Sequence, residues 1–164
     1  MPHRVTSLQD LRISDYRKLK DRELARESDR FIAEGEYIVR RLLASDYRCE
    51  SVFLEERREA EIAPIVPAGI PVFVAPTEVY RQIVGYKFNS GVLAVGRRRP
   101  DVTLYNLPAL SNSTCTLVIC PEIASVANMG SLIRTSAAFG VDAMLLGERC
   151  CDPFWRQSVR VSMG

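Results

Sequence analysis

Short apolar runs and amphipathic segments alternate along this chain. Residues 31–33 form a brief apolar run, Gly35 interrupts it, and residues 36–45 then place apolar side chains at helical spacing. The run Val72–Ala75 is continuously apolar, as is typical of a strand buried on both faces. The same patterns predict strands at 31–33, 49–55, 69–76, 90–98, 114–122 and 141–147. They predict one or two helices over 8–27 and further helices at 36–45, 55–64, 77–84, 128–139 and 151–160. This alternation predicts a layered α/β fold.

The pattern weakens in the middle of the chain, which suggests a boundary. Residues 97–114 show little periodicity, contain two prolines and begin with three arginines. We therefore expect a first domain over residues 1–99, a linker over 100–113 and a second unit over 114–164. A length of 164 residues fits either one domain of average size or two small ones.

Composition narrows the class of protein further. Hydrophobic residues make up 47% and charged residues 26% of the chain, which is ordinary for a soluble globular protein and excludes a disordered or collagen-like chain. No apolar run approaches the roughly 20 residues that span a bilayer. The first 23 residues lack the apolar core of a signal peptide. We expect a cytoplasmic protein that does not enter membranes.

Cysteine and histidine are arranged unfavourably for a metal site. The five cysteines form no CxxC pair, and His3 is the sole histidine, whereas a structural zinc site needs spaced Cys and His pairs. Cys150 and Cys151 are adjacent, but no histidine stands near them to act as a base. The sequence therefore predicts reduced, mostly buried thiols and no bound metal.

Charge offers a weaker indication of a partner. The net charge is only +2, yet 19 of the 22 basic residues are arginines, whose planar side chain suits phosphate and base stacking. Codon bias alone can produce the same ratio. Arg97, Arg98 and Arg99 stand together without an intervening acid, so we take them as candidate RNA-binding residues. The basic residues of 12–30 alternate with acids, as on any solvated helix.

Residues 117–147 carry the most specific chemistry. A strand ends in a loop that enters a helix near Asn128, and a helix N-terminus offers free N–H groups to an anion. Gly130 permits close approach of backbone or ligand. Arg134, one turn later, can hold a phosphate or orient a hydroxyl. Gly140 ends the helix before the next strand, giving a βαβ crossover. The loop lacks both GxGxxG and GxxxxGK[ST], which disfavours a standard nucleotide site.

The segment NMGSLIRTSAAFGVDAMLL resembles motif 1 of the SpoU (TrmH-like) branch of the SPOUT methyltransferases, N-x-G-x-x-x-R-T-A-x-A-x-G. The positions that match in register are Asn128, Gly130, Arg134, Thr135, Ala138 and Gly140. Residues 160–164 resemble the R-x-S-x-G stretch that lies downstream of this motif. FIAEGEYIVRRLL and NSGVLAV resemble the L30e-like substrate-binding domain that precedes many of these enzymes.

The resemblance implies an α/β protein in which an L30e-like RNA substrate-binding domain precedes the first part of an α/β-knot (SPOUT) methyltransferase domain. It implies 2′-O-methylation of a ribose in rRNA or tRNA with S-adenosylmethionine, by a homodimer when the family's full length is present. In this family the arginine that matches Arg134 acts at the ribose hydroxyl and its phosphate, and the asparagine that matches Asn128 shapes the active site. Both are catalytic candidates, and Arg160 joins Arg97–Arg99 as an RNA-binding candidate.

The sequence departs from the family pattern in three places. Ser125-Val126 stands where the family has Asp-Pro, and Ser136 replaces an alanine. The two later motifs that build the methyl-donor pocket, one with Glu and Gly and one with Ser-Leu-Asn, have no counterpart before Gly164. No cofactor-binding residue is therefore assigned. We expect a C-terminally truncated chain that is inactive alone and does not bind S-adenosylmethionine measurably.

Two other functions fit parts of the sequence. The first hundred residues could act as a non-catalytic L30e-like RNA-binding module, with salt-sensitive binding through Arg97–Arg99. The helix entrance at 128–134 could instead hold the phosphate of a small molecule, although no convincing base or nucleophile accompanies it. In purely structural terms, Asn128 could cap its helix and Arg134 could form a surface ion pair.

Overall fold

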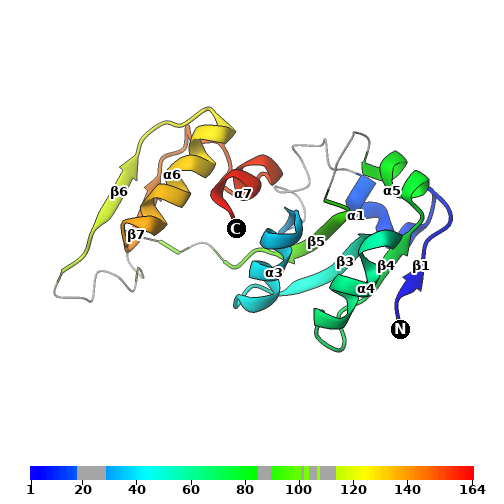
Figure 1. The fold of residues 1–164 in the computed structure, drawn as a ribbon. Helices are drawn as coiled ribbons and strands as arrows, with labels where there is room; N and C mark the ends of the chain where they lie inside the picture. Colours follow the sequence, from blue (N-terminus) through cyan, green and yellow to red (C-terminus); the bar gives the residue numbers. More distant parts are fainter. Residues whose placement is uncertain (18–28, 85–89, 101, 104–106, 108–113) are drawn as a thin grey trace.

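The computed structural model describes residues 1–17, 29–84, 90–100, 102–103, 107 and 114–164, and it forms two α/β units (Figure 1). The basic segment at 18–28 lies outside the described residues, as does most of the expected linker 100–113. The expected α/β fold class is confirmed by the alternation of strands and helices. The domain boundaries at 99 and 114 stay predictions.

The N-terminal unit is built on a five-stranded mixed sheet in the order β1-β4-β3-β5-β2. β3 pairs in parallel with β4, which pairs in parallel with β1, whereas β5 runs antiparallel to both β3 and β2. The strands are β1 (His3–Arg4), β2 (Arg30–Glu34), β3 (Cys49–Glu55), β4 (Val72–Ala75) and β5 (Val92–Arg97).

Alternating side chains give this sheet two buried faces. Val52 and Leu54 of β3 join one core cluster, whereas Phe53 between them joins the other. The first face is covered by α3 (Glu36–Ala44) and α4 (Glu59–Ile62), and the second by α1 (Ser14–Arg17) and α5 (Thr77–Val84). Short 3-10 turns at Leu11–Ile13, Glu56–Arg58 and Ala63–Ile65 complete this unit. The unit is thus a three-layer sandwich, with one core cluster on each face of its central sheet.

The inward face of α3 differs from one sequence expectation. The helical pattern predicts Tyr37 on the buried side together with Ile38, but Tyr37 is 74% exposed. Ile38, Val39 and Leu42 face the sheet instead. Ile38, Val39 and Leu42 lie on one side of the helix axis, and this side faces the sheet. Tyr37 lies on another side of α3 and therefore points to solvent.

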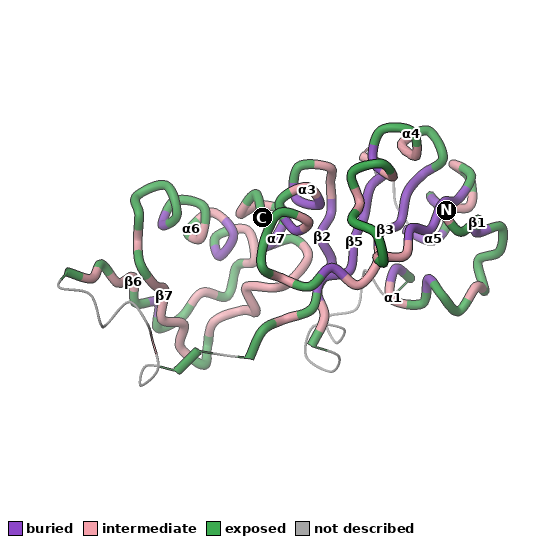
Figure 2. Tube along the Cα trace, turned by 90° about the horizontal axis from the view of Figure 1, so that it is seen from below, coloured by how far each residue is buried: buried purple, intermediate pink, exposed green. Residues whose placement is uncertain are grey.

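The C-terminal unit is smaller and more open. β6 (Leu117–Cys120) and β7 (Ala143–Leu146) pair in parallel, joined by α6 (Val126–Ala138), and α7 (Arg156–Ser162) follows. Along β6 and β7, only Cys120 is fully buried, and Ile119 is 69% exposed. Figure 2 shows the contrast between the buried strands of the first sheet and the C-terminal unit, whose residues are mostly of intermediate burial or exposed.

The ends of α6 and α7 refine the sequence predictions. α6 begins at Val126 after the N-cap Ser125, so Asn128 is its third residue and not its cap. Gly140, at φ +66°, ends α6 as expected: its N–H donates to the carbonyl of Ala137, and the N–H of Val141 donates to that of Ser136. α7 begins at Arg156 rather than near Asp152, whose carboxylate instead accepts from the N–H of Phe154.

Candidate functional site

Asn128 and Arg134, the two catalytic candidates, both lie on α6 and both are exposed. Six residues along an α-helix correspond to about 9 Å of rise and leave the two side chains about 120° apart around the axis. Helix α6 therefore does not by itself bring them to one face. Within the described part of the chain, no carboxylate forms an ion pair with Arg134, which leaves its guanidinium available to an external anion.

At Gly130, helix α7 packs directly against the backbone of α6. A Cβ at Gly130 would lie 2.6 Å from the carbonyl oxygen of Ser158 and 2.7 Å from Cβ of Val161. The hydroxyl of Ser158 donates to the carbonyl of Val126 at 3.0 Å. The glycine of the motif thus lets the two helices pack backbone against backbone.

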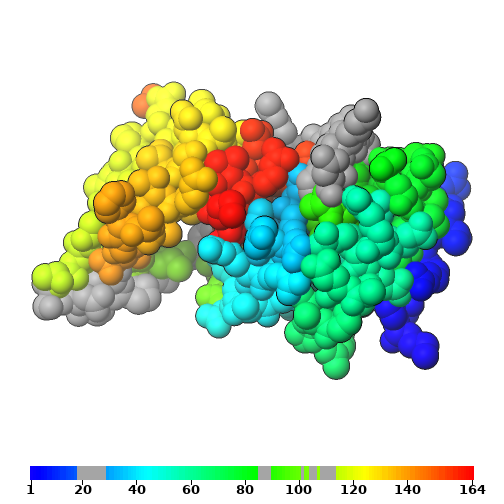
Figure 3. Space-filling view, viewed as in Figure 1, coloured from blue at the N-terminus to red at the C-terminus, as the bar shows by residue number. Residues whose placement is uncertain are grey.

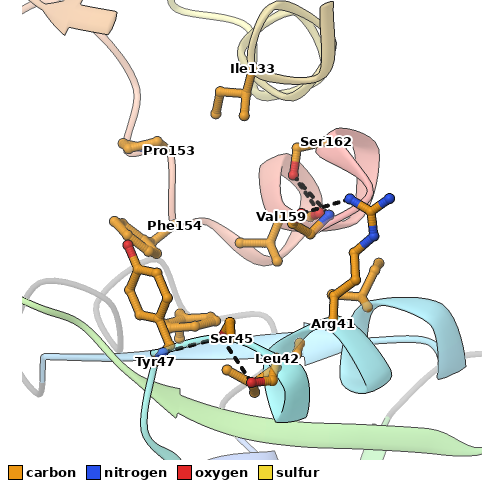
Figure 4. Close-up of a pocket in the computed structure, with 13 residues that line it drawn as sticks. Arg41, Leu42, Ser45, Tyr47, Ile133, Pro153, Phe154, Val159 and Ser162 are labelled. Atoms are coloured by element: carbon orange, nitrogen blue, oxygen red, sulfur yellow. Dashed lines mark hydrogen bonds between the residues drawn. The ribbon is translucent and has the colours of Figure 1, made fainter. Parts of the chain in front are cut away.

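The described cavities do not lie beside the catalytic candidates. A cavity of about 330 Å³ lies between the two units, and its lining includes Ile133 of α6 but neither Asn128 nor Arg134 (Figure 4). Apolar side chains provide most of its wall.

The three consecutive arginines after β5 are each engaged with an acid. Arg97 lies 3.3 Å from Glu50, Arg99 lies 3.2 Å from Asp46, and Arg98 pairs with Asp152 of the C-terminal unit. The side chains of Arg97 and Arg99 are about half exposed, whereas that of Arg98 is only 18% exposed. The structure thus leaves two of the three open to solvent and turns the third inward.

Arg97 belongs to a larger basic groove that the sequence does not reveal. With Arg30 and Arg48 it lines an open groove of about 800 Å³ at one end of the sheet, between the start of β3 and the loop 67–71. Glu50 sits among them, 2.6 Å from Nε of Arg30. We call Arg30, Arg48 and Arg97 the arginine groove. Their common location follows from strand pairing, since Arg30 is directly opposite Arg97 in the ladder.

Arg160 lies at the contact between the two units. Its Nη1 is 2.8 Å from Oε1 of Glu34, and Nε of Arg156 is 3.3 Å from Oε2 of the same carboxylate. Glu34 is 1% exposed. Sequence reasoning missed Glu34; the available signal was a lone acid that ends an apolar strand just before Gly35.

All five cysteines are free thiols, and burial changes the acidity of three of them. Burial raises the pKa of Cys49 to about 11 and also raises the pKa of Cys120 and Cys151 above the ordinary thiol value. A raised thiol pKa disfavours the reactive thiolate at neutral pH. Among the residues with described positions, no group of three His, Cys, Asp or Glu side chains is placed to hold a metal ion.

Comparison with known proteins places this geometry in a family. The family described as the MRM3-like substrate binding domain matches residues 10–94, more than half of the chain. The chain is 35% identical over 160 residues to an uncharacterized tRNA/rRNA methyltransferase of Mycobacterium bovis, covering 94% of this chain and 54% of that protein. It is 22% identical to a 23S rRNA (guanosine-2′-O)-methyltransferase of Bacillus subtilis, covering 98% of this chain and 60% of that protein. The chain thus spans about half the length of the curated relatives it matches.

Solved structures show the same fold across both units. An AdoMet-bound rRNA methyltransferase from Sinorhizobium meliloti superposes with a TM-score of 0.82 at 24% identity, covering 99% of this chain and 60% of that chain. The SpoU methyltransferase AviRb from Streptomyces viridochromogenes gives a TM-score of 0.76 at 19% identity, covering 95% and 60%. No helix within the described ranges is both long enough and apolar enough to span a membrane. The chain therefore belongs to the family of proteins with an MRM3-like substrate-binding domain, and it has the fold of the SpoU methyltransferases.

Proposed function

We propose that this chain is the substrate-binding unit and the first catalytic elements of an S-adenosylmethionine-dependent 2′-O-ribose methyltransferase acting on rRNA or tRNA. Two observations together support the proposal: residues 10–94 match the substrate-binding family, and nearly the whole chain has the fold of an rRNA methyltransferase. In this fold, Asn128 and Arg134 are exposed on α6. The relatives' names supply the substrate class. A homodimer and a cytoplasmic location stay predictions from the sequence.

Arg134 suits the chemistry that such a reaction needs from the protein. A ribose 2′-hydroxyl is a poor nucleophile, and a nearby cation stabilises the oxyanion that develops as its proton leaves. The guanidinium can also bind the adjacent phosphate through two parallel hydrogen bonds. S-adenosylmethionine, when bound, supplies the methyl group, and we assign no residue to its binding.

The arginine groove, together with the exposed Arg99, supports RNA binding by the N-terminal unit. Each phosphate contact releases counterions, so binding to RNA should weaken steeply with salt. We expect Arg48→Ala and Arg97→Ala each to weaken binding of an rRNA fragment and to reduce the slope of log K against log salt by about 0.7–0.9. Fluorescence anisotropy over a salt series measures both quantities.

Arg149 provides a matched control for that titration. It is 73% exposed and pairs with Glu122 on the C-terminal unit, away from the groove. Arg149→Ala should leave the slope unchanged. Equal losses in all three variants would show that only net charge matters and would contradict an RNA surface at the groove.

A chimera tests the catalytic part of the proposal. This chain replaces the matching 160 residues of the Mycobacterium bovis relative, and radioactive methyl groups are traced into alkali-resistant dinucleotides of rRNA and tRNA, a product specific to 2′-O-methylation. We expect Arg134→Ala to reduce incorporation by about 10²-fold or more, as for loss of a group that stabilises an oxyanion. Arg149→Ala should retain full incorporation. A fully active Arg134→Ala chimera would overturn the catalytic assignment.

One observation favours the non-catalytic RNA-binding module as a second candidate. Nearly all of the described buried hydrophobic core lies within residues 5–95, whereas most residues of β6, β7 and α6 are partly buried or exposed. A chimera that binds RNA through the arginine groove but transfers no methyl group would favour the module.

A further inference from the structure

A buried carboxylate joins the two units of the molecule. Glu34 is the last residue of β2 and is 1% exposed, and its two oxygens face two arginines one turn apart on α7. Oε1 lies 2.8 Å from Nη1 of Arg160, and Oε2 lies 3.3 Å from Nε of Arg156. A buried charge is tolerated only when it is paired, so the carboxylate depends on α7 remaining in place.

Further contacts tie the same segment to the N-terminal sheet. Arg98 pairs with Asp152 and its guanidinium lies 4.6 Å from the ring centre of Phe154. Phe154 also packs against Phe31 and Tyr47, at centroid distances of 5.2 and 6.0 Å. Phe31, Tyr47 and Phe154 line the apolar cavity of about 330 Å³ between the units (Figure 4).

Helix α7 is also packed firmly on α6. Gly130 allows the backbone of α7 at Ser158 to approach α6 so closely that no Cβ would fit between them. The space-filling view shows α7 wedged between α6 and the N-terminal unit (Figure 3). Whatever holds α7 on the sheet therefore also holds α6, the helix that carries Asn128 and Arg134.

We propose that Glu34 is a positioning residue: through Arg156 and Arg160 it docks α7 on the N-terminal sheet and sets the orientation of α6 relative to the substrate-binding unit. Arg160 then serves this contact between the units rather than RNA. The value of the orientation for methyl transfer rests on the proposed function, whereas the docking itself does not.

Trp155 allows the docking to be measured directly. It is the sole tryptophan of the chain and immediately precedes Arg156 at the start of α7. In Glu34→Gln, we expect Trp155 emission to move to longer wavelength and backbone amides of residues 152–162 to exchange faster. Arg160→Gln should cause a smaller change in the same direction. The double variant should differ little from Glu34→Gln, because both substitutions remove the same contact.

Glu55 is a matched control for Glu34. It is also the last residue of a strand, is 2% exposed, and is bound by Arg57 and by the Thr77 hydroxyl, all within the N-terminal unit. Glu55→Gln should lower the melting temperature without moving Trp155 emission or exchange at 152–162.

The proposal is overturned if Glu34→Gln keeps the parent emission and exchange, or if Glu55→Gln changes them equally. If Glu34→Gln does not fold, the Arg160→Gln variant tests the docking instead. The Arg160 side chain is 46% exposed, so its substitution should leave the fold intact. Parent-like emission and exchange in that variant would contradict the docking role. Neither measurement uses RNA or S-adenosylmethionine, so its failure is distinct from failure of the proposed function.

Discussion

Cys49, at the start of β3, shows how position in the fold changes the chemistry of one side chain. The thiol is buried in the first core cluster and its sulfur lies 3.6 Å from the carbonyl oxygen of Ser51. Burial raises the pKa of Cys49 to about 11. The folded state therefore holds the thiol proton more tightly than the unfolded chain does.

This shift predicts a specific pH dependence of stability. Because the pKa is higher in the folded state, the contribution of Cys49 is complete below pH 9 and is lost as the pH rises toward 11. The free energy of unfolding of the parent should therefore fall more steeply over this range than that of Cys49→Ala. Urea unfolding at several pH values measures both slopes. Parallel slopes would contradict the prediction.

Single residues also mark the limits of reading the sequence. The pattern correctly identifies Gly140 as the residue that ends α6, because a glycine at positive φ after a helix is a local requirement. It wrongly places Tyr37 in the core, because the orientation of α3 is decided by the sheet it covers. A requirement on a single residue's backbone can be seen in the sequence, whereas the side of a helix that faces the core depends on the elements it packs against.

At the scale of elements, the packing of α6 on α7 depends on Gly130. An alanine there would bring its Cβ to 2.6 Å from a backbone oxygen that cannot rotate away. We expect Gly130→Ala to lower the free energy of unfolding by about 1–3 kcal/mol, the usual cost of overpacking. Chemical denaturation followed by Trp155 fluorescence measures the change.

Ser131→Ala, on the same helix, is the comparison for that variant. It removes a hydroxyl and adds no atom, and alanine favours helix, so we expect a change within about 0.5 kcal/mol. If Gly130→Ala proves as stable as Ser131→Ala, the two helices do not pack as closely in solution as they do here.

Most elements follow from their own segments of sequence. The predictions for 49–55 and 77–84 match β3 and α5 residue for residue, because continuous apolar runs and helical spacing are local signals. The sequence places the start of α7 near residue 151, whereas the helix begins at Arg156. Asp152 and Pro153 are typical of a helix start, but Asp152 pairs with Arg98, which is 54 residues away in the sequence.

At the scale of the whole molecule, Arg98 and Arg99 are neighbours with different environments. Arg98 and its partner Asp152 are both largely buried between the units, whereas Arg99 pairs with Asp46, which is 93% exposed. We expect Arg98→Ala to cost about 2 kcal/mol of stability, because it leaves a largely buried carboxylate unpaired. Arg99→Ala should cost no more than about 1 kcal/mol.

Urea unfolding of the two variants under identical conditions measures this difference. Equal losses in both variants would mean that the contact between the units is as open to solvent as the surface pair, contrary to the structure. The comparison also separates stability from RNA binding, for which Arg99 is the more exposed of the two.

The residues of the candidate site, like the elements, fall into those that the sequence identifies and those that only the structure brings together. Asn128, Gly130 and Arg134 were identifiable because a motif in one helix is contiguous in sequence, and the α/β class because each strand and helix carries its own periodicity. The sequence by itself thus determined the elements and the motif residues. Only the tertiary structure decided that Arg30 and Arg48 join Arg97, and that Arg98 and Arg160 hold the two units together. The reason is physical: ion pairs and grooves form between residues distant in sequence, and strand pairing and helix packing bring them within reach.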